Sequence, residues 1–152
     1  DLKTNLRKFL CMAGGETDLT ALPPKTEDDD LLSGLPDPEQ LPVWLTEADL
    51  DFYTNEFSNS TMRGPINYYR NHDLTWEMTE GAPTEIHQPA MFVAGTNDGV
   101  VMMAEEAIKL MPQFVKDLRI NHMIEGIGHW TQQEAPDEVN AQILAFLKDV
   151  DT

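Results

Sequence analysis

The spacing of hydrophobic residues at the start of the chain predicts a helix followed by a long irregular segment. Four apolar residues fall on one helix face, and they are Leu2, Leu6, Phe9 and Leu10. Gly14 and Gly15 then end the pattern, because glycine favours helix termination. Residues 16–45 show no periodicity. With five prolines and an acidic run at 27–30, they predict a solvated connecting loop or flap.

Two further helical segments are predicted in the first half of the chain. Thr46 can cap the first of them, and acidic residues in its first turn suit the helix dipole. The apolar stripe of this helix consists of Leu50, Tyr53 and Phe57. Gly64-Pro65 breaks or restarts the helix, and residues 66–78 return to a helical pattern. The first half therefore contains no predicted strand.

The second half follows the order strand, helix, strand, helix. The continuous apolar run at 89–95 predicts a strand buried on both faces. A helix at about 101–111, a second strand at 118–124 and a last helix beginning at Pro136 follow. This order is typical of a parallel sheet covered by helices, so the predicted fold class is α/β. Two strands are too few for such a sheet, and Asp1 begins within a helical pattern, so we expect further strands from a preceding segment.

Composition narrows the classes of partner and compartment. The chain has 152 residues, and its 41% of hydrophobic residues is enough to bury a core. The formal net charge of −17 argues against nucleic acid and against an anionic membrane surface. No apolar run is long enough to span a membrane, and no signal-peptide pattern is present. The single cysteine, Cys11, favours a reducing compartment, so we expect a cytoplasmic protein.

Candidate chemistry follows each of the two predicted strands. Asp98 lies in the segment 95–99 (GTNDG), and His129 lies in the segment 126–130 (GIGHW). Because loops after neighbouring parallel strands meet at one edge of the sheet, we expect these two side chains to lie within reach. A carboxylate that accepts the imidazole N–H would fix the tautomer of His129 and make it a general base. The alternatives for each residue alone are an ordinary turn aspartate and a structural loop histidine.

Other kinds of site find no support in the sequence. No two histidines have the spacing of metal ligands and Cys11 is isolated, so no metal is expected. Neither common type of glycine-rich phosphate loop occurs, and no cofactor is expected. No serine lies in a G-x-S-x-G elbow, and no aspartate has the small neighbours that a strand-to-helix elbow requires. The sequence thus offers a candidate base, His129, and a carboxylate to orient it, Asp98, but no candidate nucleophile.

The segment 63–71 (RGPINYYRN) resembles the cap-domain motif of epoxide hydrolases of the α/β-hydrolase fold. In that motif the second aromatic of the pair is a tyrosine that faces the active site. The resemblance continues through Trp76, through 95–98 and 126–130, and into the start of the last helix at 133–136. It implies a mostly parallel sheet flanked by helices, with a helical cap, of which this chain covers only the C-terminal part. Residues 1–84, with the loop at 16–45, would be part of the cap, and residues 85–152 the last part of the core.

The resemblance also implies a mechanism. An aspartate at the nucleophile elbow would attack an epoxide carbon to form a covalent ester, while Tyr69 donates a proton to the ring oxygen. His129, oriented by Asp98, would then deprotonate the water that hydrolyses the ester to a vicinal diol. The residues implied to form or support the substrate pocket are Trp130, Val100 and Tyr68. A complementary N-terminal segment would supply the nucleophile, the oxyanion loop and a second tyrosine, and the cap could support a homodimer.

Two other functions remain open from the sequence. A haloalkane dehalogenase or a carbon–carbon bond hydrolase on the same fold would share the Asp98–His129 arrangement without needing Tyr69 as a donor. A non-catalytic interaction fragment with a vestigial histidine is the second alternative, because the chain shows no nucleophile.

Overall fold

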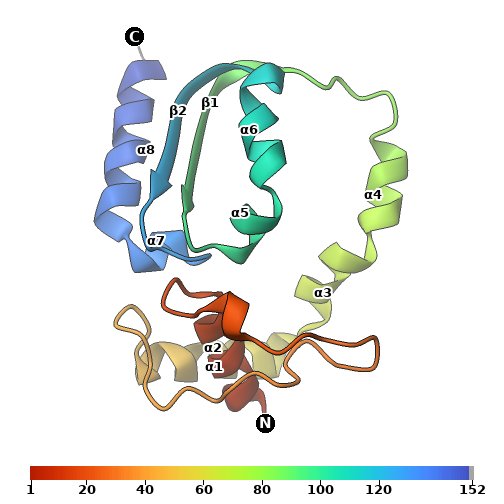
Figure 1. The fold of residues 1–152 in the computed structure, drawn as a ribbon, viewed down its shortest axis with the longest axis vertical. Coiled ribbons are helices and arrows are strands. Elements are labelled where there is room, and N and C mark those ends of the chain that lie inside the picture. Colours follow the sequence, from red (N-terminus) through yellow and green to blue (C-terminus); the bar gives the residue numbers. More distant parts are fainter. Residues whose placement is uncertain (151–152) are drawn as a thin grey trace.

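The computed structural model describes residues 1–150 as a helical part and a small α/β part (Figure 1). The helical part contains α1 (Leu2–Ala13), a 3₁₀ turn (Leu19–Ala21), α2 (Glu47–Ser60), α3 (Arg63–Arg70) and α4 (His72–Met78). The α/β part contains β1 (Ile86–Gly95), α5 (Gly99–Met103), α6 (Glu105–Phe114), β2 (Val115–Ile124), α7 (Thr131–Glu134) and α8 (Pro136–Val150). The predicted division into a helical first half and a strand–helix second half is confirmed.

The boundaries of several helices differ from those expected from the sequence. The predicted helix at 101–111 is two helices, α5 and α6, which meet at Ala104, and α6 continues past Pro112. Gly64-Pro65 lies in the first turn of α3, where the missing N–H of proline leaves no helical hydrogen bond unmade. The chain instead changes direction at Thr61, whose φ of 62° lies in the left-handed region. The cap of α2 is as predicted, since Thr46 and Asp49 form a reciprocal capping box.

The strands β1 and β2 pair in parallel and form the centre of the α/β part. Their register places Val93 opposite His122 and Gly95 opposite Ile124, so both strands end at the same edge of the sheet. Helix α6 packs against β2, while α8 contacts both strands, and Figure 1 shows these helices on either side of the pair. The buried apolar residues of this part are Ala94, Ile124 and Val139.

The segment 16–45 is irregular, as predicted, but it is tied to the helical part and does not lie wholly in solvent. Leu35 and Leu45 are buried, with 5% and 4% of their surfaces exposed. Arg7 of α1 forms a bidentate ion pair with Asp37. The distances from its Nε and Nη2 to the two carboxylate oxygens are 2.8 and 2.6 Å. A guanidinium and a carboxylate fit each other in this geometry, so the ion pair fixes the course of the loop over α1.

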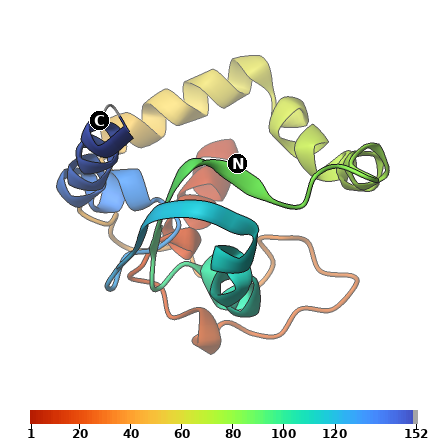
Figure 2. The ribbon, with the colours of Figure 1, turned by 90° about the horizontal axis from the view of Figure 1, so that it is seen from above.

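Helices α1 and α2 pack together below the carboxyl ends of the strands (Figure 1). The view from above shows α2 passing along one side of the strand pair and leading through α3 to α4 (Figure 2). Lys3 joins α1 to α2 electrostatically, with its Nζ 2.6 Å from Asp51 and 3.0 Å from Glu47. None of the helices in residues 1–150 combines the length and the apolar character needed to cross a membrane.

Three backbone segments approach one another closely where the strands end, and this approach requires glycine. A Cβ atom at Gly95 would collide with the carbonyl group of Ile127, and one at Gly128 would collide with the backbone of Gly15. These contacts are backbone to backbone, so no side-chain rotation can relieve them. The loop that carries His129 is therefore held against both β1 and the end of α1.

Gly95→Ala tests this close packing. We expect it to lower the free energy of unfolding by about 1–3 kcal/mol, the usual cost of overpacking, as measured by urea denaturation. Gly64→Ala is the matched control, because no atom lies within 4 Å of a Cβ at this exposed helical position. That change should stabilise the chain by about 0.5–1 kcal/mol, since alanine loses less backbone entropy than glycine in a helix. Equal stability of Gly95→Ala and the parent chain would contradict the described packing.

Candidate active site

Hydrogen bonds join the two loops that leave the ends of β1 and β2. The N–H of Thr96 donates to the carbonyl of Ile124 at 3.0 Å, which extends the pairing one step beyond the sheet. The N–H of Asn97 donates to the carbonyl of Ile127 at 2.9 Å, and the N–H of Gly126 donates to the hydroxyl of Thr96 at 2.9 Å. These hydrogen bonds therefore tie the two loops to each other and to the edge of the sheet.

Asp98 and His129, which the sequence placed at this edge, are in contact. The distance from Oδ2 of Asp98 to Nδ1 of His129 is 3.1 Å. The other carboxylate oxygen of Asp98 accepts the N–H of Val100 at 2.8 Å and caps α5. Asp98 is buried, with 8% of its surface exposed, whereas 44% of the His129 side chain is exposed. The carboxylate is thus fixed from one side by the backbone and faces the imidazole from the other.

The contact defines which nitrogen of His129 can exchange protons with a reactant. An ionised carboxylate can only accept a hydrogen bond, so Nδ1 carries the proton that faces Asp98. In the neutral ring, Nε2 then carries the lone pair, and it lies on the side of the imidazole away from Asp98. Protonation at Nε2 gives an imidazolium that the Asp98 carboxylate stabilises directly. The geometry therefore suits a general base.

The C-terminal end of α1 supports the loop that carries His129. The N–H of His129 donates to the carbonyl of Ala13 at 2.9 Å, and the indole N–H of Trp130 donates to the carbonyl of Leu10 at 2.7 Å. These two carbonyls belong to the last turn of α1, where helical partners are lacking. The Trp130 ring stands edge-on to His129 and to Phe9, with centroid distances of 5.1 and 5.9 Å. Trp130 therefore packs between the histidine and α1.

The remaining residues expected at the site lie in two places. Val100 lies two residues after Asp98, in α5, and is 52% exposed. Tyr68 and Tyr69 lie on α3, which both ribbon views place apart from the ends of the strands. Tyr69 is 71% exposed and its ring contacts His72 at a centroid distance of 5.7 Å, while Tyr68 is 81% exposed. The structure thus brings Asp98, His129, Val100 and Trp130 together, and presents the two tyrosines on a separate helix.

Asn97 is a site residue that was not selected from the sequence. Its side-chain amide donates to the carbonyl of Gly15 at 2.9 Å and lies 3.4 Å from the carbonyl of Gly126, so it joins the end of α1 to the histidine loop. Its position between Thr96 and Asp98 in a strand-end segment was a signal for a positioning role. The partners lie far away in the sequence, so the pattern alone did not identify them.

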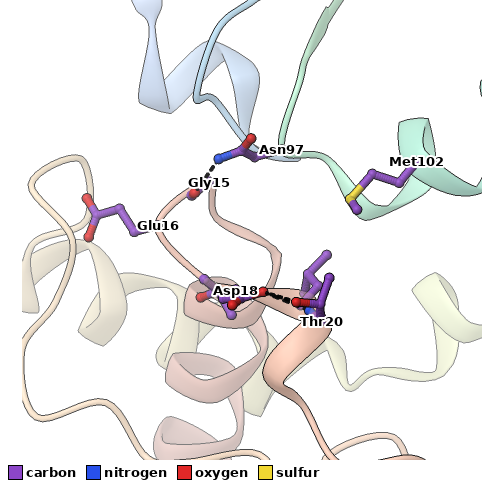
Figure 3. A pocket seen from close by; sticks show the side chains of 8 residues that line it. Gly15, Glu16, Asp18, Thr20, Asn97 and Met102 are labelled. Atoms are coloured by element: carbon purple, nitrogen blue, oxygen red, sulfur yellow. Dashed lines mark hydrogen bonds between the residues drawn. The ribbon is translucent and has the colours of Figure 1, made fainter.

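A cavity of about 310 Å³ lies beside this junction (Figure 3). The residues that line it are Gly15, Glu16, Thr17, Asp18, Leu19, Thr20, Asn97 and Met102. The hydroxyl and the N–H of Thr20 both donate to Asp18, and these hydrogen bonds lower the pKa of the Asp18 carboxyl below its ordinary value. The cavity borders the loop of Asp98, but its lining within residues 1–150 does not include Asp98 or His129. No group of three or more potential metal-ligating side chains occurs in the described part of the chain.

The Asp98→Asn variant tests the role of the carboxylate in selecting the tautomer. Asparagine can still cap α5 through its carbonyl oxygen, but its amide group then points a donor at Nδ1 of His129. We expect the neutral imidazole to change from the Nδ1–H form to the Nε2–H form, as measured by ¹⁵N NMR of the ring nitrogens. Asp137→Asn, in the exposed first turn of α8, is the control and should leave the tautomer unchanged. Retention of the Nδ1–H form in Asp98→Asn would contradict the proposed geometry.

The chain is similar to known proteins in both sequence and structure. No protein-family model matches the chain. Epoxide hydrolase B of Mycobacterium tuberculosis is 41% identical over 111 residues, a match that covers 72% of this chain and 31% of that protein. Bifunctional epoxide hydrolase 2 of Mus musculus is 34% identical over 142 residues, which cover 93% of this chain and 25% of the mouse protein. The chain therefore spans less than half of the length of these curated relatives.

Solved structures of epoxide hydrolases are similar to this chain over nearly its whole length. An epoxide hydrolase from an endophytic Streptomyces superposes with a TM-score of 0.90 at 34% identity, covering 99% of this chain and 47% of that one. Epoxide hydrolase A from Mycobacterium thermoresistibile superposes with a TM-score of 0.84 at 33% identity, covering 96% of this chain and 46% of that one. The relatives of this chain in sequence and in structure are therefore epoxide hydrolases of the α/β-hydrolase fold, and the chain corresponds to their C-terminal part.

Proposed function

We propose that this chain supplies the water-activating half of an active site that hydrolyses an epoxide to a vicinal diol. The observation that carries the proposal is the contact between buried Asp98 and partly exposed His129, in a chain whose relatives are epoxide hydrolases. In the proposed reaction His129 is the base of the second step. Its Nε2 removes a proton from water, and the resulting hydroxide attacks the carbonyl carbon of an aspartyl ester.

The proposed chemistry begins with the formation of that ester. A carboxylate oxygen of the nucleophilic aspartate forms a bond to one epoxide carbon, and the bond from this carbon to the ring oxygen breaks. The ring oxygen takes a proton from the Tyr69 phenol as negative charge develops on it. In the second step the attack of hydroxide releases the diol and regenerates the aspartate, while the proton held by His129 returns to the phenolate or to solvent. The Asp98 carboxylate stabilises the imidazolium between these events.

The proposal places the nucleophilic aspartate outside the 152 residues. Asp98 is the aspartate in contact with His129, and both of its carboxylate oxygens already have partners, the Val100 N–H and the imidazole. It is therefore an orienting residue and unsuited to attack. The related epoxide hydrolases are at least twice as long as their matched segments, so a preceding segment of such a protein could hold the nucleophile, the oxyanion loop and a second tyrosine.

Exposed aromatic groups on the α3–α4 segment support such an arrangement. Tyr68, Tyr69 and Trp76 are 81%, 71% and 81% exposed, which is unusual for rings of this size. We propose that α3 lies over the site in the assembled protein, with the Tyr69 hydroxyl directed at the ring oxygen and Tyr68 beside it. Val100 and Trp130 would form the wall of the pocket next to His129. A haloalkane dehalogenase would use the same base without Tyr69, so variants of Tyr69 discriminate between these functions.

His129→Gln separates the two steps of the proposed reaction. Glutamine cannot remove a proton from water, so the ester should form and persist, and diol formation should fall by about 10²-fold or more. Mass spectrometry of the complete protein, which includes the segment with the nucleophile, should show a mass increase equal to one epoxide after incubation with styrene oxide. His87→Gln is the control, since His87 is an exposed residue paired with Glu85 at the start of β1. Unchanged turnover in His129→Gln would remove the histidine from the mechanism.

Tyr69→Phe tests the donor to the ring oxygen. Phenylalanine keeps the shape of the ring and lacks only the hydroxyl. Diol formation should fall by about tenfold or more, because the charge that develops on the epoxide ring oxygen would be less well stabilised. Tyr53→Phe on α2 is the matched control, because Tyr53 packs edge-on against Phe52 in the helical part. Equal rates in Tyr69→Phe and the parent protein would exclude Tyr69 as a donor and would favour another hydrolase of the same fold.

A further inference from the structure

The carboxylate of Glu134, at the end of α7, accepts three backbone hydrogen bonds from two distant parts of the chain. Its Oε2 accepts the N–H of Gly15 and the N–H of Gly128, each at 2.9 Å. Its Oε1 accepts the N–H of Trp130 at 3.0 Å. All three bonds are partly buried, so solvent competes with them weakly, and each is strengthened by the charge on the acceptor.

We propose that Glu134 is a positioning residue that sets where His129 stands against Asp98. Two of its three donors, Gly128 and Trp130, are the residues on either side of the histidine. The N–H of His129 itself donates to Ala13. Each peptide N–H from 128 to 130 therefore has a fixed acceptor, and the backbone that carries the imidazole is held on both sides. The catalytic meaning of this inference rests on the function proposed above for His129.

A carboxylate is the side chain that this arrangement requires. The three donors converge on two oxygens, and a carboxylate offers acceptors at both positions without a competing donor. The corresponding amide would direct its NH₂ group at either the Trp130 N–H or the pair formed by Gly15 and Gly128. At least one of these buried N–H groups would then lose its partner, which costs about 1–3 kcal/mol per group in proteins.

The bond to Gly15 extends the effect of Glu134 beyond the histidine loop. Gly15 lies between α1 and the irregular segment 16–45, and its carbonyl accepts a hydrogen bond from the side-chain amide of Asn97 at 2.9 Å. The peptide groups of Gly15 are thus bound to Glu134 through the N–H and to the loop of Asp98 through the C=O. Glu134 and Asn97 together hold the start of this segment, the histidine loop and the aspartate loop in one arrangement.

The test is ¹⁵N NMR of the imidazole nitrogens of His129 in the full chain, compared among Glu134 variants. In Glu134→Gln the ring should leave its position against Asp98, so the fraction of neutral imidazole in the Nδ1–H form should fall by about twofold or more. Glu134→Asp keeps both acceptor oxygens, but its side chain is one methylene shorter, so they lie further from the three N–H groups. Its fraction of the Nδ1–H form should lie between those of the parent and of Glu134→Gln. Glu125→Gln is the matched control, because it also removes one carboxylate charge, from an exposed residue of the loop that carries His129. The control should leave the tautomer fraction unchanged.

Two results would overturn the proposal. One is a parent-like tautomer fraction in folded Glu134→Gln, as verified by circular dichroism. The other is failure of both Glu134→Gln and Glu134→Asp to fold, which would mean that Glu134 is required for the stability of the whole fold. Where the protein turns over styrene oxide, kcat in Glu134→Gln should fall about tenfold with KM within a factor of two. The tautomer measurement needs no turnover, so a complete protein, with the segment that holds the nucleophile, that is inactive on epoxides but shows the expected shift would refute the proposed function and leave the role of Glu134 standing.

Discussion

The parallel pairing of β1 with β2 is the interaction on which the site depends. Its register sets Gly95 opposite Ile124, so that two loops separated in the sequence by α5, α6 and β2 leave the sheet at one edge. The contact between Asp98 and His129 joins the two loops, and it forms only because the strands end together. A shift of one residue in the pairing would turn the side chains of one strand to the opposite face and separate the loops.

Backbone contacts rather than side-chain packing then fix the geometry at this edge. The glycines at 15, 95 and 128 let three backbone segments approach more closely than any side chain would allow. Hydrogen bonds from Asn97 and to Glu134 hold these segments in place, and the last turn of α1 supplies acceptors for His129 and Trp130. The exposed histidine is thus attached to a rigid backbone support. The proposed role of His129 in proton transfer requires such a support, because displacement of a catalytic group by about 1 Å lowers the reaction rate steeply.

The sequence predicted the parts of the molecule that local pattern determines. The continuous apolar run before Gly95 and the alternation before Ile124 indicated the strands, and strand ends indicated Asp98 and His129. Their contact could be expected because parallel strands bring such loops together. The division of the helix after Asp98 into α5 and α6 could not be predicted, since both helices share one apolar pattern and the break at Ala104 has no glycine or proline to mark it.

The supporting residues of the site could not be identified from the sequence for a different reason. Glu134 is one of many acidic residues in a chain with 27 of them, and only the folded structure shows that its carboxylate faces Gly15, 119 positions away. Trp130 was expected at a pocket wall, and its bond to Leu10 depends on where α1 packs. The role of Tyr69 came from a resemblance in its motif and remains a prediction, because α3 presents this tyrosine at the surface of the described chain.

These features describe a chain in which His129 contacts the carboxylate of Asp98 on a rigid backbone support. The proposed function makes this histidine the base in the hydrolysis of an enzyme-bound ester. Its most direct test is one turnover of styrene oxide by excess complete protein in H₂¹⁸O. The account predicts that the first diol contains no ¹⁸O and that the label enters the protein, because the new oxygen of the diol comes from a carboxylate. A first diol that carries ¹⁸O would mean direct attack by water and would contradict the account.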